Sequence, residues 1–262
     1  MNARSLLAEA FGTFFLVFFG CSVVAVDTLY SSFGSLWSIA AAWGVIVTLA
    51  ILFTAPLSGA HLNPAITLAF ATVDKFPLRR VLPYWLAQFV GAFLAAASVH
   101  LVWRPSGTIG NASNPHFSTE NFHSQETAKF FGEYFSQDTP LWQAALAEGL
   151  GTYFLAFAVF AFVTSSRKKS FPASAIAPAV GLALTLLIAI FAPISMAGFN
   201  PARDLAPRCY SALAGWKEFA FQTNGHGWWI VYVIAPLLAG PIGAFSAVLL
   251  IGKPKEPKIG KT

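Results

Sequence analysis

The feature that most constrains this chain is a tripeptide, Asn-Pro-Ala, that occurs twice in matching surroundings. Each copy follows a long apolar run and a break rich in Pro, Gly and Ser, and the residues concerned are Asn63, Pro64, Ala65, Asn200, Pro201 and Ala202. Asn is a strong helix N-cap because its side-chain oxygen accepts a first-turn N–H, and Pro suits the next position because its missing N–H is not needed there. Each copy therefore predicts the start of a short helix. A single copy would indicate only a capped turn, but two copies in equivalent positions indicate a shared site.

The composition places these helix starts in a membrane. The chain has 262 residues, of which 56% are hydrophobic and only 10% are charged, and its mean hydropathy is +0.63. A chain this apolar is not a soluble domain, so we expect an integral, multi-pass protein surrounded by the lipid bilayer. The first residues lead into an apolar segment without an obvious cleavage site, which favours a retained helix over a signal peptide.

Several functional classes find no support in the sequence. No His, Cys or carboxylate residues have metal-ligand spacing, and neither a Ser/His/Asp arrangement nor a glycine-rich phosphate loop occurs. The net charge of +5 is not accompanied by a basic-aromatic motif for nucleic acid. We therefore expect no metal, no cofactor, no nucleic-acid partner and no enzymatic activity.

Six segments reach the length of about 20 apolar residues that a spanning helix needs. They are residues 6–26, 35–55, 81–102, 141–164, 173–192 and 228–251. The segments 63–73 and 200–212 are too short to span, and the second carries Arg203, Asp204 and Arg208, so it must lie against protein or water. The predicted fold class is an all-α membrane protein with six transmembrane helices and two re-entrant half-helices.

The two halves of the chain repeat each other. The run Ala-Glu-x-x-Gly-Thr around Glu9 returns around Glu148, and Asn63 returns as Asn200. We expect one channel domain over residues 1–262, with repeats at approximately 5–103 and 141–251 and a loop at approximately 104–140. Each repeat has three spans, an odd number, so the repeats are inverted and the short helices enter from opposite sides. Two Asn amides with free donors and two positive helix ends then meet at mid-membrane, as in the polar waist of a pore.

The basic residues give the orientation. Arg4, the clusters at residues 75–80 and 167–169, and the tail lysines after residue 252 all fall on one side of a six-span chain. That side is predicted to be cytoplasmic, together with both termini, in a plasma or cell inner membrane. The acidic loop 104–140 then lies outside and is long enough for a vestibule. It contains a glycosylation sequon at Asn111, which has a meaning only outside bacteria.

These features resemble the major intrinsic proteins, the aquaporin family, over nearly the whole chain. The resemblance rests on the doubled motif, with Ser-Gly-Ala-His-Leu before the first copy and Arg after the second. It implies a right-handed bundle of six helices with two half-helices, one pore per subunit, and a homotetramer. The residues that look like the glycerol-conducting branch are Asp204, Arg208, Pro236 and Leu237.

The resemblance also implies a narrow outer filter. Counted from the two Asn residues, the filter positions are Trp43, Ile188, Ala197 and Arg203. Glycerol facilitators usually carry Gly and Phe where this chain has Ile188 and Ala197, and the combination found here is similar to that of the plant nodulin-type branch. We therefore expect an amphipathic filter of intermediate width.

The remaining candidate residues flank the two motifs. A cation three residues into a helix N-terminus opposes the helix dipole, so Arg203 is interpreted as functional. Non-helical backbone at membrane depth is tolerated where it lines a cavity. We therefore expect a ladder of carbonyl acceptors for permeants at Gly59, Ala60, His61, Leu62, Met196, Gly198 and Phe199. Glu9 and Glu148 either brace the backbone N–H groups of the loops beside them or form a proton relay; their place in the repeat favours bracing.

The leading functional hypothesis is a passive channel for water and small uncharged solutes such as glycerol that excludes protons and ions. The alternative is a secondary transporter of small neutral solutes that uses the intramembrane glutamates, because inverted repeats with broken helices occur in transporters too. Glycerol, urea, lactic acid, hydrogen peroxide and metalloid acids all stay open as permeants.

Overall fold

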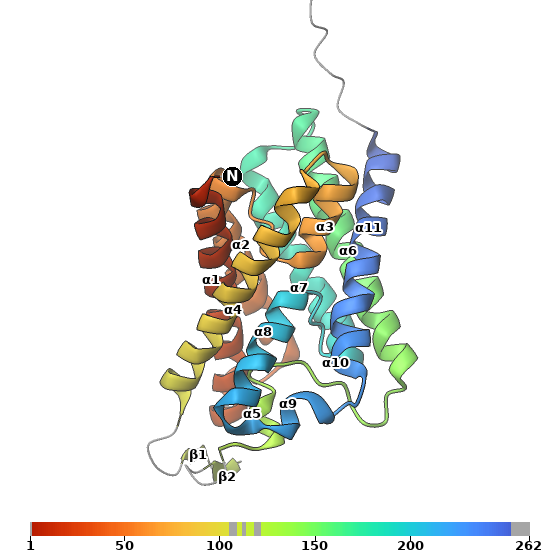
Figure 1. Ribbon diagram of the computed structural model, residues 1–262. Coiled ribbons are helices and arrows are strands. Elements are labelled where there is room, and N and C mark those ends of the chain that lie inside the picture. Colours follow the sequence, from red (N-terminus) through yellow and green to blue (C-terminus); the bar gives the residue numbers. More distant parts are fainter. Residues whose placement is uncertain (1, 105–108, 112–113, 118–121, 253–262) are drawn as a thin grey trace, which may run out of the picture.

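The computed structural model describes residues 2–104, 109–111, 114–117 and 122–252, and shows an upright bundle of helices (Figure 1). Within these residues six helical segments are long and apolar enough to cross a membrane. They contain the helices α1 (Ala3–Tyr30), α2 (Leu36–Ser58), α4 (Val81–Trp103), α6 (Leu141–Arg167), α7 (Ile176–Ser195) and α11 (Ala235–Ile251). Short turns extend three of them: η1 (Leu78–Arg80), η2 (Ala173–Ala175), α10 (Gly227–Trp229) and the π-helical η4 (Ile230–Ile234).

Two half-helices lie in the middle of the bundle. They are α3 (Pro64–Val73) and α8 (Pro201–Ser211), and they occupy opposite halves of the bundle along its length (Figure 1). The predicted half-helices are therefore present, within one or two residues of their expected ends. After α8 the chain continues through a π-helical turn, η3 (Ala212–Trp216), into α9 (Glu218–Gln222).

The helices pack as two equivalent sets. Helix α1 packs on α4 in the first half as α6 packs on α11 in the second, and α2 meets α7 between the halves. At that central crossing a side chain at Gly44 would overlap Thr185, and one at Gly181 would overlap Thr48. Only glycine allows the two backbones this close approach, which ties the two repeats together.

The two ends of the bundle differ. Helix α1 begins and α11 ends at one end, which we call the inner end, and the opposite, outer end carries an antiparallel hairpin (Figure 1). The hairpin pairs β1 (Ile109–Asn111) with β2 (Asn114–Phe117), and α5 (Gln125–Ala128) follows it. The all-α prediction is therefore right for the membrane bundle, while the loop 104–140 holds two short strands that the sequence did not reveal.

Some expectations fall on residues outside the described part of the chain. Ala112 and Ser113 of the sequon lie there, as do the tail lysines Lys253, Lys255, Lys258 and Lys261.

The long helices also run beyond the predicted spans. Helix α1, for example, continues past Asp27 to Tyr30, because the Asp27 carboxylate accepts the N–H of Phe33 at 3.0 Å and so has a polar partner at the helix end.

Candidate pore and its constriction

A cavity of about 580 Å³ runs along the contact between the two repeats. Its lining extends from Asp27 and Lys129 at the outer end to Ala173 and Ile176 at the inner end, and most of it is apolar. The lining includes both motif asparagines, all predicted ladder positions and all four predicted filter positions. Pro64, Ala65, Pro201 and Ala202 instead form the first turns of the half-helices and are buried behind the lining.

The two asparagines approach each other inside this cavity. Asn63 Oδ1 accepts the N–H of Ala65 at 2.8 Å, and Asn200 Oδ1 accepts that of Ala202 at 3.0 Å, so each caps its own half-helix. The amide nitrogens cross over: Asn63 Nδ2 donates to the Phe199 carbonyl at 2.9 Å, and Asn200 Nδ2 donates to the Leu62 carbonyl at 2.8 Å. The expectation of free NH2 donors was therefore wrong in part, because each amide uses one N–H to hold the opposite loop and has one left for the lumen.

The loops before the asparagines have unusual backbone conformations. The left-handed region of φ, between 51° and 68°, is occupied by the non-glycine residues Ala60, Leu62, Met196, Ala197 and Phe199. Such conformations cost about 1–3 kcal/mol each and persist only where surrounding contacts hold them. Within the described chain, no hydrogen bond ends on the carbonyls of Gly59, Ala60 or His61, or on those of Met196 and Gly198. Those oxygens therefore remain as acceptors along the cavity.

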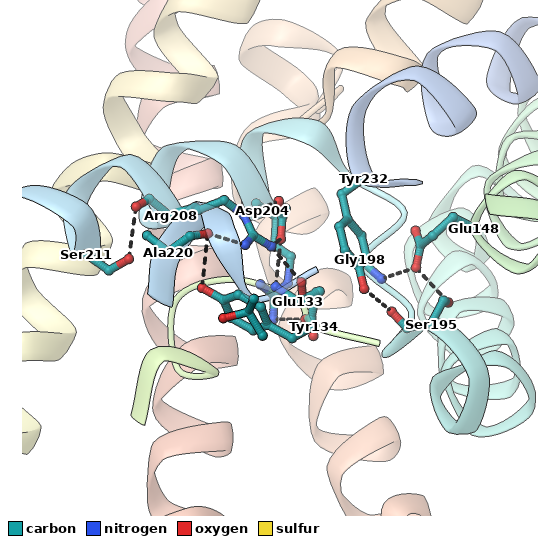
Figure 2. Close-up of polar contacts among 12 residues, drawn as sticks. Glu133, Tyr134, Glu148, Ser195, Gly198, Asp204, Arg208, Ser211, Ala220 and Tyr232 are labelled. Atoms are coloured by element: carbon teal, nitrogen blue, oxygen red, sulfur yellow. Dashed lines mark hydrogen bonds and ion pairs between the residues drawn. The ribbon is translucent and has the colours of Figure 1, made fainter. Parts of the chain in front are cut away.

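Two buried glutamates hold the loops in these conformations. Glu9 accepts the N–H groups of His61 at 2.9 Å and Leu62 at 2.8 Å. Glu148 accepts those of Gly198 at 2.8 Å and Phe199 at 2.7 Å, as Figure 2 shows in part. Both side chains are fully buried. Each carboxylate thus satisfies two consecutive backbone donors that a helix or strand would otherwise have to pair.

Further polar residues complete this support, and the sequence reasoning did not single them out. Gln88 donates to Glu9 at 2.7 Å, and the Ser195 hydroxyl donates to Glu148 at 2.8 Å. Tyr84 donates to the Ser58 carbonyl at 3.0 Å, and Tyr232 donates to the Ser195 carbonyl at 2.9 Å. The repeat itself held the signal, because Ser58 and Ser195 have the same spacing from their motif asparagines.

His61 has its side chain turned into an aromatic cluster. The ring is buried and stacks on Phe70 with centroids 4.4 Å apart, and it also contacts Phe76 and Tyr84. Its contribution to the predicted ladder therefore comes from its backbone carbonyl.

The predicted filter residues lie together near the outer end of the cavity. Trp43, Ile188, Ala197 and Arg203 are all buried. The Arg203 Cζ atom lies 4.7 Å from the centre of the Trp43 ring. Its Nη2 pairs with the carboxylate of Glu133, whereas Nη1 is buried without a hydrogen-bond partner in the described chain. This part of the cavity therefore combines apolar side chains with one unused NH2 group, the Nη1 of Arg203.

Comparison with known proteins identifies the family of this chain. The sequence model of the family "Major intrinsic protein" matches residues 1–247. The chain belongs to the major intrinsic protein family. Among the described residues there is no cluster of three or more His, Cys, Asp or Glu that could hold a metal. This major intrinsic protein is a channel and not an enzyme, as its sequence predicted.

Its relatives include bacterial uptake facilitators. The propanediol uptake facilitator PduF of Citrobacter freundii is 34% identical over 252 residues, covering 94% of this chain and 91% of that protein. The glycerol uptake facilitator protein of Escherichia coli K12 is 34% identical, with 94% and 88% of the two chains covered. The aquaglyceroporin from Plasmodium falciparum has the same fold, with a TM-score of 0.78 at 24% identity over 92% of this chain and 93% of that one.

The four residues that resemble the glycerol-conducting branch lie in two different parts of this channel. Asp204 and Arg208 form a buried ion pair along α8, with Arg208 Nη2 2.8 Å from Asp204 Oδ1. Together they hold the loop that carries Glu133, because Asp204 accepts the Glu133 N–H at 2.7 Å and Arg208 donates to the Glu133 carbonyl at 2.6 Å (Figure 2). Pro236 and Leu237 lie in the first turn of α11, where Pro236 is buried.

Gly20 on α1 sets the position of the Trp43 ring. A Cβ at Gly20 would overlap that ring, so the ring lies directly on the bare helix backbone. We expect Gly20→Ala to push Trp43 toward the lumen and lower solute flux several-fold, since overpacking a tight contact costs about 1–3 kcal/mol. Swelling of proteoliposomes in glycerol measures this. Gly149→Ala on α6 is the control, because its Cβ would meet only Ala239, at 3.9 Å. Equal flux in both variants would show that Trp43 does not limit passage.

Proposed function

We propose that this chain is a passive channel for water and small uncharged solutes of about glycerol size, and that it excludes protons and ions. The observation that carries the proposal is that Arg203, whose Nη1 has no partner in the described chain, lies with its Cζ 4.7 Å from the Trp43 ring centre. Ile188 lines the same cavity. A linear polyol has a carbon edge and a hydroxyl edge. Trp43 offers apolar contact to the first, while Arg203 and the loop carbonyls offer partners to hydroxyls that lose water on entry.

The relatives support this solute class. They are named for the uptake of glycerol and of propanediol, which are small polyols. The residues proposed to select the solute are Trp43, Ile188, Ala197 and Arg203, and those proposed to form the polar waist are Asn63 and Asn200. Asp204, Arg208, Pro236 and Leu237 support assignment to the glycerol-conducting branch. We further propose a homotetramer in the plasma or cell inner membrane with both termini cytoplasmic. The support is that basic residues lie at the inner end: Arg4 is in the first turn of α1, and Lys168 donates to the Ile251 carbonyl at the end of α11.

The test of the function is solute flux in proteoliposomes. We expect swelling in glycerol and 1,2-propanediol that rises linearly with the gradient and has a low activation energy, without measurable proton conductance. Saturable flux coupled to an ion gradient would support the alternative of a secondary transporter. That alternative needs Glu9 or Glu148 to gain and lose a proton during transport. Both carboxylates instead accept hydrogen bonds from loop N–H groups.

Arg203 is proposed to balance the charge of the Glu133 carboxylate and so to keep cations out. Replacing it with Gln removes the fixed positive charge and leaves the Glu133 carboxylate facing the lumen without its partner. We expect Arg203→Gln to leak monovalent cations or protons at least about tenfold above the parent, because a charge interaction of this kind is worth several kcal/mol at short range. The measurement is the reversal potential under a KCl gradient. A variant that excluded potassium as well as the parent does would contradict this role.

A further inference from the structure

The charges along the cavity raise the question of what keeps anions out. Within the described chain the cavity lining has four charged residues: Asp27 and Lys129 toward the outer end, and Glu133 and Arg203 at the constriction. Further in, α3 and α8 both point their N-termini at the waist through Asn63 and Asn200. A helix N-terminus has a partial positive charge and favours anions. Arg203 and the two helix ends together would therefore attract a small anion.

Glu133 offsets this positive field. Its carboxylate pairs with Arg203 Nη2, and its side chain is only 8% exposed. The other carboxylates nearby are occupied elsewhere: Asp204 pairs with Arg208, and Glu148 holds the loop N–H groups of Gly198 and Phe199. In the described chain Glu133 is thus the carboxylate at the constriction that cancels the charge of Arg203.

The position of Glu133 is fixed by its backbone. Its N–H donates to Asp204 Oδ1 at 2.7 Å, and its carbonyl accepts from Arg208 Nη2 at 2.6 Å (Figure 2). The Arg208 guanidinium is itself buried and lies 4.4 Å from the Tyr134 ring centre. Glu133 lies in an irregular loop, and these contacts pair both its backbone N–H and its carbonyl with the buried side chains of Asp204 and Arg208.

We propose that Glu133 is a specificity-determining residue of this channel, whose carboxylate cancels the charge of Arg203 at the constriction and so excludes anions. A permeating ion must lose water, and an opposite charge in the wall is the strongest partner that can offset that loss. With Glu133 ionised, the Arg203–Glu133 pair offers no net charge to an ion of either sign. This inference rests on the proposed function, since it concerns the selectivity of the same constriction.

The pH dependence follows from the surroundings of Glu133. Burial raises its pKa to about 7, while the Arg203 charge acts in the opposite direction. The titratable and charged groups that face it are Arg203, Asp204, Arg208, Glu148, Cys21, Tyr134 and Tyr232. A raised pKa means that the carboxylate takes up its proton as the pH falls through about 7. The anion barrier should therefore be present above that pH and weaken below it.

The experiment compares Glu133→Gln with the parent at pH 8. Each protein is fused from proteoliposomes into a planar bilayer, and its conductance and reversal potential are measured under a potassium formate gradient. We expect the Gln variant to conduct formate at least about tenfold more than the parent, with a reversal potential shifted toward that of the anion. Asp27→Asn is the matched control, because it removes another lining carboxylate from the outer end of the same cavity and should keep formate out. Arg203→Gln should shift the potential the opposite way, toward the cation.

Two further measurements keep the result decisive. Glycerol swelling of the same vesicles shows whether each variant pore is open, and a parent that passes no polyol would overturn the proposed function without touching the comparison of ions. If Glu133→Gln does not fold, the parent alone is measured at pH 8 and pH 5.5, where formate conductance should rise at the lower pH. An open Gln variant that excludes formate as the parent does, or a parent whose anion exclusion is the same at both pH values, would overturn the proposal.

Discussion

Replacing Glu148 with Leu is expected to abolish solute flux and to destabilise the channel severely. The change removes the acceptors for the Gly198 and Phe199 N–H groups and for the Ser195 hydroxyl. Each buried donor left without a partner costs about 1–3 kcal/mol, so the two backbone N–H groups alone cost about 2–6 kcal/mol. The left-handed conformations of Met196, Ala197 and Phe199 would lose their support at the same time. The loss is a large part of a total stability of about 5–15 kcal/mol.

The measurements are thermal unfolding in detergent and glycerol swelling after reconstitution. Glu148→Gln keeps one acceptor oxygen and should fall between the parent and the Leu variant. Glu126→Leu is the matched control, because Glu126 is an exposed glutamate of the short helix α5 and exposed substitutions of this kind usually change stability by less than about 0.5 kcal/mol. Glu9→Leu should be as damaging as Glu148→Leu, since Glu9 holds His61 and Leu62 in the same way. A folded, conducting Leu variant at either position would contradict the bracing role.

The repeated parts of this molecule are the parts that its sequence predicts best. Helices form wherever about 20 apolar residues follow one another, and an Asn-Pro pair fixes where each half-helix begins. Trp43, Ile188, Ala197 and Arg203, which were counted from the two asparagines, all line one cavity, and their role as a filter stays a prediction. Here a family resemblance supplied what periodicity could not, because nothing in the apolar run around Trp43 distinguishes a lumen-facing ring from a lipid-facing one.

The contacts that cross between elements could not be predicted in this way. Glu133 lies in an irregular loop, and its position depends on the Asp204–Arg208 pair, whose contact with that loop no sequence pattern indicates. The crossed amide bonds of Asn63 and Asn200 likewise depend on how closely the two loops approach. Gly20 gave no signal at all, since its role is to leave space for a ring from another helix.

Enlarging Ala197 to Phe is expected to cut glycerol flux by about tenfold or more, which corresponds to about 1.4 kcal/mol added to the barrier. Ala197 lines the cavity beside Arg203 and leaves that side of the constriction open. A phenyl ring there would fill part of the cavity that Trp43, Ile188 and Arg203 also line. Water is smaller than glycerol, so its flux should fall less.

Backbone strain is the competing explanation for a loss of flux. Ala197 has a φ of 63°, which larger side chains adopt with difficulty. Phe199, two residues later, already adopts a φ of 51°, so this loop accommodates a phenyl side chain in such a conformation. Ala197→Ser controls for the remaining effect of substitution, because it is polar but small and should keep most of the glycerol flux.

The ratio of glycerol flux to water flux separates narrowing from damage. A pore narrowed at Ala197 loses glycerol flux first, whereas a misfolded loop loses both fluxes together because Asn200 no longer holds the waist. Stopped-flow measurements of both fluxes on one preparation give this ratio directly. An equal loss of both fluxes would place the size limit elsewhere along the cavity. A high water flux with background glycerol flux in the parent itself would assign this channel to the water-selective branch, despite Asp204, Arg208, Pro236 and Leu237.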